Sequence, residues 1–291
     1  MKNISCPLLT SGVILIAGLA LLLYARAAKR PMEIRLRWRQ YLIIGAVNSA
    51  IPFALIAAAQ LRLTASLAAI LNATSPLFGA VIAAVWIKDS LTMKKIGGLI
   101  LGITGVAVLV GWSPMDVSLE VALSIGASLM AAGFYGIASV YTKAKVAGAP
   151  SLGMAVGSQL GASLLLLPLI PVVPPFSPPS VGVLFCVVLL ALGSTGLAYL
   201  LYFRLIVDVG PAKALTVTFL IPIFGVMWGG LFLGEQITLS ELVGCAIILV
   251  GTSLVLGVRP RLTSIFSLCN RKRKFERKKR IAHNEIISYD I

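Results

Sequence analysis

The sequence predicts an all-α polytopic membrane protein with about nine transmembrane helices, built as two inverted repeats. Hydrophobic residues make up 58% of the 291 residues and charged residues only 12%, whereas soluble domains carry roughly a quarter charged residues. The apolar residues gather in blocks of about 20, the length at which a helix rising about 1.5 Å per residue crosses a bilayer core. One long pattern also occurs twice, with the 146-residue offset that separates Pro76 from Pro222.

Hydropathy gives the position of each expected helix. A transmembrane segment is a mostly apolar run, and charged, glycine or proline residues lie between one run and the next. We expect segments at residues 7–26, 41–61, 65–87, 95–112, 119–141, 152–172, 181–206, 211–233 and 240–257.

Lysine and arginine predict the orientation. Of the 25 such residues, all except Lys2 and Arg62 fall in one set of loops or in the C-terminal tail. The basic side of a helical membrane protein is cytoplasmic. We therefore expect a cell (inner) membrane protein with its C-terminus inside and its N-terminus outside. This rule accounts for the net charge of +15, so we expect lipid and not nucleic acid at the tail. The opening residues also resemble a signal peptide that ends at Ala27. Its cleavage would leave the basic residues of 28–40 on the outer side of the membrane, so we do not expect it.

The repeated pattern contains "TSPLFGAVIAAVWIKDSLT" at 74–92 and "LIPIFGVMWGGLFLGEQIT" at 220–238. The eighth segment comes five crossings after the third, so the two copies have opposite orientations, the layout of many secondary transporters. Eight residues fall on identical residues without a gap. They are Ala68, Pro76, Phe78, Gly79, Thr92, Gly98, Gly105 and Gly111, which match Ala214, Pro222, Phe224, Gly225, Thr238, Gly244, Gly251 and Gly257.

The segment at 119–141 has no partner, because the same offset places its counterpart before Met1. We therefore expect a ten-helix fold whose first helix is missing. The predicted organisation is a first repeat of four segments at 1–112, a second repeat of five segments at 113–258 and a basic cytoplasmic tail at 259–291.

Both copies, at 65–111 and 210–257, resemble the EamA domain of the drug/metabolite transporter superfamily, through the pattern P-x-F-G, then G-E-x-x-T, then G-x6-G. The resemblance covers nearly all of 7–257. It implies ten helices in two inverted repeats, and export or exchange of amino acids, other metabolites or drugs. The first copy has Lys88-Asp89 where the second has Gly234-Glu235, so we expect the tight glycine turn only in the second copy.

Polar side chains inside the segments are the candidate substrate-binding residues. A buried amide in hydrocarbon costs several kcal/mol unless it is paired, so these groups should face the interior, as a cavity lining or as hydrogen bonds between helices. Asn72 and Thr218 are related by the repeat. The candidate cavity residues are Asn48, Ser49, Asn72, Ser75, Gln159, Ser194, Thr195, Tyr199, Tyr202 and Thr218.

Prolines and glycines are candidate structural devices. Pro76 and Pro222 lie within segments, where proline removes a helix hydrogen bond, and we expect hinges there unless neighbouring helices accommodate them. Glycines allow close packing of helices within the chain, or in a homodimer. The candidate packing glycines are Gly98, Gly105, Gly244 and Gly251, with the GxxxG pairs Gly157/Gly161 and Gly225/Gly229.

Asp89 and Glu235 follow segment ends, and we expect them to stabilise helix N-termini. All ten acidic residues lie outside the segments or at their ends, which favours a facilitator or exchanger over proton coupling.

Scattered cysteines and a single histidine, His283, predict no catalytic residue, no metal site and no cofactor. The leading hypothesis is a secondary transporter of a small polar metabolite or drug. The alternative is a truncated or non-transporting scaffold that needs a partner helix. An enzyme is disfavoured.

Overall fold

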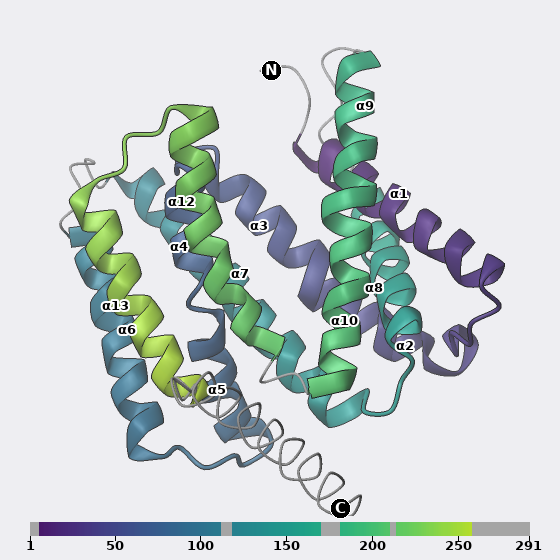
Figure 1. Cartoon of the computed structure of the whole chain (residues 1–291), viewed down its shortest axis with the longest axis horizontal. Coiled ribbons are helices and arrows are strands. Elements are labelled where there is room, and N and C mark those ends of the chain that lie inside the picture. Colours follow the sequence, from purple (N-terminus) through teal and green to yellow (C-terminus); the bar gives the residue numbers. More distant parts are fainter. Residues whose placement is uncertain (1–5, 112–117, 170–180, 210–213, 258–291) are drawn as a thin grey trace, which may run out of the picture. The chain divides into compact units, whose positions relative to one another are not determined.

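The computed structural model describes residues 6–111, 118–169, 181–209 and 214–257 (Figure 1), and the regular structure in these ranges is helical, without a β-strand. The basic tail predicted at 259–291 lies outside the described residues. Within these described ranges, six helical segments are long and apolar enough to cross a membrane, and three apolar helices are shorter. The chain is therefore a multi-pass membrane protein. The six are Ile34–Ala59, Ala65–Trp86, Met93–Gly111, Leu119–Lys145, Val181–Asp208 and Leu239–Leu256.

The described helices overlap the expected segments, although several ends differ. α2 begins at Ile34 and α7 ends at Lys145, beyond the apolar blocks, because long basic side chains continue a helix while their charges stay in water. The elements are α1 (Cys6–Ala27), α2 (Ile34–Gly45), η1 (Ala46–Ala50), α3 (Ile51–Ala59), α4 (Ala65–Asn72), α5 (Ser75–Trp86), α6 (Met93–Gly111), α7 (Leu119–Lys145), α8 (Ser151–Leu166), η2 (Leu167–Leu169), α9 (Val181–Leu189), η3 (Leu190–Leu197), α10 (Ala198–Val209), η4 (Leu215–Phe219), α12 (Leu220–Leu233) and α13 (Leu239–Leu256).

Several of these helices are interrupted in their middle. Pro76 follows the break between α4 and α5, and Pro222 follows the short 3₁₀ segment η4. The π-helical segments η1 and η3 interrupt two other helices. Proline cannot donate the backbone hydrogen bond that the carbonyl four residues earlier accepts in a regular helix, and π segments distort the same ladder. Polar side chains near these points therefore have backbone groups to bind.

Helices α6 and α13 pack closely along their length (Figure 1). A Cβ atom added to Gly98 would lie 2.5 Å from the Gly251 carbonyl oxygen, and one added to Gly251 would lie 2.6 Å from that of Gly98. Gly105 and Gly244 approach in the same way, because a Cβ on Gly244 would lie 3.0 Å from the Gly105 oxygen. The four glycines thus let two backbones touch, as small residues do between membrane helices.

The turn after α5 corrects one expectation. Lys88 takes the left-handed backbone conformation (φ 53°), as Gly234 does (φ 66°) in the second copy. The Asp89 amide donates to the Ala83 oxygen at 3.2 Å, and the Glu235 amide donates to the Gly229 oxygen at 3.1 Å. The prediction that the first copy lacks the tight turn is therefore wrong. The turn persists because its hydrogen bond offsets the ~1 kcal/mol that a side chain costs at positive φ.

Helix α8 lies at the centre of one core region, where it packs against α1, α2 and α10. Much of α8 is buried, from Leu152 to Gln159 without interruption. Glycine makes the approach possible: a Cβ atom on Gly45 of α2 would lie 2.5 Å from the Ser158 carbonyl oxygen. This contact holds the start of η1 directly against α8 and brings Ser49 within reach of Gln159.

Candidate functional site

The candidate site is a hydrogen-bonded group of side chains from η1, α8 and α10. The Gln159 amide nitrogen donates to Ser49 Oγ at 3.3 Å, and Ser49 Oγ lies 3.0 Å from the Tyr199 hydroxyl. The Tyr199 hydroxyl donates to the Asn48 carbonyl oxygen at 3.0 Å. The side chains of Ser49 and Gln159 are fully buried. Four predicted cavity residues therefore lie together, although the bonded pairs Ser49–Gln159 and Asn48–Tyr199 are 110 and 151 positions apart in the chain.

The hydrogen bonds of this group run in one direction, from Gln159 through Ser49 and Tyr199 to the Asn48 carbonyl. Pro52 cannot supply the backbone donor for the Asn48 carbonyl, and the single Tyr199 hydroxyl hydrogen takes its place. Ser49 must then donate to Tyr199, which leaves Ser49 Oγ to accept from the Gln159 NH₂ group. The opposite amide orientation would lose one of these bonds. Among the residues that the structure describes, none donates a hydrogen bond to the buried Gln159 Oε1, and an unpaired buried acceptor costs about 1–3 kcal/mol.

Aromatic side chains border this group on α10. The Phe203 ring packs between those of Tyr199 and Tyr202, with centroid distances of 5.9 Å and 5.6 Å. The phenol of Tyr135 on α7 lies near both tyrosines. Sequence reasoning missed Tyr135, although its position among the small residues of "AAGFYGIA" (131–138) is a signal for a side chain that faces a packed neighbour.

The remaining predicted cavity residues lie at other helix interruptions. Ser75 Oγ donates to the Asn72 carbonyl oxygen at 2.5 Å and lies 3.2 Å from its side-chain oxygen. Proline 76 removes the backbone donor to the same carbonyl, so Ser75 replaces it. Thr195 of η3 is buried, whereas Ser194 is exposed and donates to the Leu190 oxygen at 3.0 Å. Thr218 lies in η4, four residues before Pro222. Ser75 and Ser194 thus bind carbonyl oxygens close to them in the chain.

A cavity of about 260 Å³ lies beside the Pro76 break, between α5, α7 and α13. Small residues line it on α5, among them Gly79 and Ala83, and Asp89 and Lys95 lie at it as an ion pair with an N–O distance of 3.4 Å. Pro76 therefore has open space next to it, which a bend of the helix at this point requires.

Glu235 joins two distant parts of the chain. Its carboxylate accepts hydrogen bonds from the Ala65 amide at 2.7 Å, the Ser66 amide at 3.0 Å and the Ser66 hydroxyl at 2.5 Å. It thus caps α4, which is not the helix that follows it in the chain. Burial raises the pKa of Glu235, but the hydrogen bonds from Ser66 and Ala65 outweigh burial and hold the pKa below its ordinary value.

Known proteins resemble the chain over most of its length. The model of the EamA-like transporter family matches residues 1–111 and 122–257. "Uncharacterized transporter YvbV" of Bacillus subtilis (strain 168) is 28% identical over 261 residues, which cover 86% of this chain and 83% of the relative. "Uncharacterized transporter YoaV" of the same organism is 24% identical over 250 residues, covering 84% and 85%. A solved crystal structure shares the fold, with a TM-score of 0.62 at 17% identity over 87% of this chain and 88% of the other. The resemblance inferred from the repeated pattern is confirmed.

Proposed function

The chain belongs to the EamA-like transporter family, and on this premise we propose that it exports or exchanges a small polar metabolite, amino-acid-like, or a drug by alternating access. The family and the names of both relatives indicate a membrane transporter of the drug/metabolite superfamily. The proposal adds the substrate class, the direction and the mechanism, with nine transmembrane segments, the N-terminus outside and the C-terminus in the cytoplasm.

Two inverted repeats, at 1–112 and 113–258, form the proposed framework. Support comes from features that recur at the 146-residue offset. The π segment Ala46–Ala50 corresponds to part of Leu190–Leu197, and the left-handed Lys88 corresponds to Gly234. The contact of Gly98 with Gly251 becomes, under the same exchange, the contact of Gly244 with Gly105. Such reciprocal contacts are the property of a two-fold axis, which relates the halves of inverted-repeat transporters.

The unpaired acceptor of Gln159 carries the proposal for the substrate. A buried carbonyl oxygen without a donor is destabilising in the empty protein, and a ligand with an N–H or ammonium group relieves this when it binds. Hydroxyls of Tyr199 and Ser49 lie next to it, and aromatic rings suit the apolar part of such a ligand. An amine-bearing or zwitterionic small molecule fits these groups.

Interrupted helices support alternating access. The break before Pro76, the 3₁₀ segment before Pro222 and the two π segments concentrate bending at a few places, and rocking of one repeat against the other requires such places. The cavity beside Pro76 gives one of them room to move.

Counterflow in liposomes tests the function. Purified protein is reconstituted, loaded with unlabelled solute and assayed for uptake of labelled amino acids, other amines and cationic drugs. We expect counterflow for an amine-bearing solute. In Gln159→Leu the apparent affinity for this solute should fall about 10- to 100-fold, which is the effect of one hydrogen bond to a charged donor. The control is Thr104→Ala, at an exposed hydroxyl of α6, with unchanged counterflow.

Two results would contradict the proposal. Counterflow that is unchanged in Gln159→Leu removes this residue from the substrate site. No counterflow of any solute in the panel favours the alternative, a non-transporting scaffold that needs a partner helix.

A further inference from the structure

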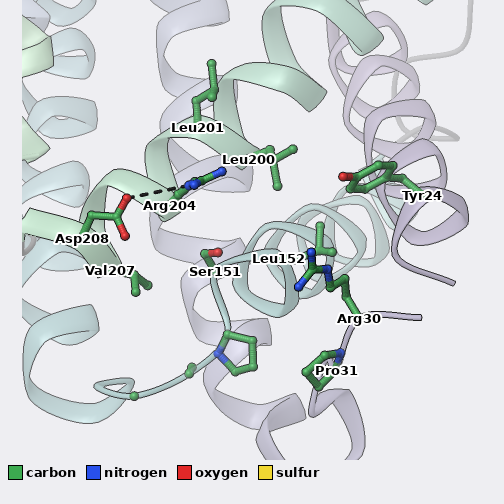
Figure 2. A pocket seen from close by; sticks show the side chains of 13 residues that line it. Tyr24, Arg30, Pro31, Ser151, Leu152, Leu200, Leu201, Arg204, Val207 and Asp208 are labelled. Atoms are coloured by element: carbon green, nitrogen blue, oxygen red, sulfur yellow. Dashed lines mark ion pairs between the residues drawn. The ribbon is translucent and has the colours of Figure 1, made fainter. Parts of the chain in front are cut away.

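A second cavity, of about 590 Å³, lies away from the Gln159 group, between the end of α1, the start of α8 and α10. Figure 2 shows the side chains of Arg30 and Arg204 around the first residues of α8. Tyr24, Leu200, Leu201 and Val207 form its apolar wall. A cationic end and an apolar wall in one cavity are the two halves of a site for an amphiphile.

The local structure explains why Arg30 reaches this cavity. Lys29 takes a positive φ of 49°, which ends α1, and the Arg30 amide donates back to the Ala25 oxygen at 3.0 Å. The chain therefore reverses before Pro31 and directs Arg30 toward α8. Among the residues that the structure describes, no carboxylate forms an ion pair with the Arg30 guanidinium.

Arg204 is also available to a ligand. Its only described ion-pair partner is Asp208, at an N–O distance of 3.8 Å, and both side chains are mostly exposed (74% and 60%). A distance of 3.8 Å is too long for a hydrogen bond, so the guanidinium keeps its donors. Asp208 also lines the cavity, and its charge opposes an anion there. The three charged groups sum to one positive charge.

The first turn of α8 adds donors to the two arginines. Pro150 stands at the N-cap position, and no side chain caps the helix, so the amides of Ser151 and Leu152, both of which line the cavity, have no intrahelical partner. Guanidinium groups bind phosphate with paired hydrogen bonds.

We propose that this cavity binds the phosphate group of an anionic phospholipid at the cytoplasmic surface, through Arg30 and Arg204. The apolar wall favours a lipid over a soluble phosphate, because Leu201 and Val207 are each 56% exposed on a helix that the membrane surrounds. A phospholipid places acyl chains along such side chains while its phosphate reaches the arginines.

Binding to the purified full-length chain in detergent tests this. The probes are dioleoyl phosphatidylglycerol, the zwitterionic dioleoyl phosphatidylcholine and inorganic phosphate, with binding measured by native mass spectrometry. We expect phosphatidylglycerol to bind more tightly than phosphatidylcholine. Arg30→Gln and Arg204→Gln should each weaken it about tenfold, the effect of one charge-assisted hydrogen bond. Asp208→Asn should tighten it a few-fold. The control, Arg35→Gln, removes an exposed charge outside the cavity and should leave binding unchanged.

The three probes distinguish a phospholipid ligand from free phosphate. Inorganic phosphate that binds as tightly as phosphatidylglycerol, and displaces it, would overturn the assignment to a lipid. Equal binding of both lipids, or binding that is the same in Arg30→Gln, Arg204→Gln and Arg35→Gln, would overturn the site itself. Thermal unfolding of each variant in the same detergent establishes that it is folded, since all four substitutions replace exposed side chains.

Discussion

Replacement of Glu235 by alanine tests whether one carboxylate joins the two halves of the chain. The side chain accepts three hydrogen bonds, from the amides of Ala65 and Ser66 and from the Ser66 hydroxyl. Loss of an N-cap acceptor costs about 0.5–2 kcal/mol. Glu235 is part-exposed, so water replaces some of the lost bonds, and Thr64 still caps the Leu67 amide at 3.2 Å. We therefore expect destabilisation of about 2 kcal/mol, near the upper end for one cap.

Glu235→Gln separates charge from hydrogen bonding. Glutamine keeps one acceptor oxygen, so we expect about half the effect, about 1 kcal/mol. The matched control is Glu120→Gln, which breaks an exposed ion pair with Arg62 (N–O 2.7 Å) and should change stability by less than about 0.5 kcal/mol. The measurement is unfolding of the purified protein in mixed micelles with increasing sodium dodecyl sulfate.

The stability should also depend on pH through Glu235. Its pKa is lower in the folded protein than the ordinary value of 4.5, so the folded state holds the ionised form more strongly than the unfolded state. The stabilisation is complete above pH 4.5 and is lost as pH falls below it through the folded pKa. Glu235→Gln should lack this loss. The reasoning is refuted if the alanine variant is as stable as the parent and both respond alike to acid.

Three further outcomes are expected. Gly251→Val should lower the free energy of unfolding by about 3 kcal/mol, because its Cβ would lie 2.6 Å from a backbone oxygen of α6. The control in the same unfolding assay is Gly97→Val, because Gly97 faces open space. Equal losses of stability in the two variants would contradict the packing argument. Lys88→Gly should stabilise by about 0.5–1 kcal/mol because it relieves a positive φ; no change in the unfolding midpoint would mean that the turn is not strained. Tyr199→Phe should lower the free energy of unfolding by about 1–2 kcal/mol, because the Asn48 carbonyl then has no hydroxyl donor. An unchanged unfolding midpoint would mean that this hydrogen bond does not stabilise η1.

Sequence reasoning reached the family and the multi-pass membrane fold because hydropathy and a long repeat are summed over many residues. It placed helix interruptions near Pro76 and Pro222 because proline acts locally on its own helix. It failed at Lys88, where the tight turn persists without glycine. The partner of Glu235 could not be read from the chain either, because 170 residues separate it from Ala65. Tyr135 was missed because its neighbours on α10 come from another part of the chain.

The hydroxyl donors at two helix interruptions have a mechanical consequence. At Asn48 and Asn72 the backbone carbonyl binds a hydroxyl, from Tyr199 and Ser75 respectively. A hydroxyl swings on a single bond, whereas a backbone amide is fixed to its helix, so the donor follows the carbonyl while the helix bends. In hydrocarbon an unpaired carbonyl costs several kcal/mol. We therefore expect the bending stiffness of these helices to be lowest at the level of the polar group, where a bend would leave no unpaired peptide carbonyl in the lipid.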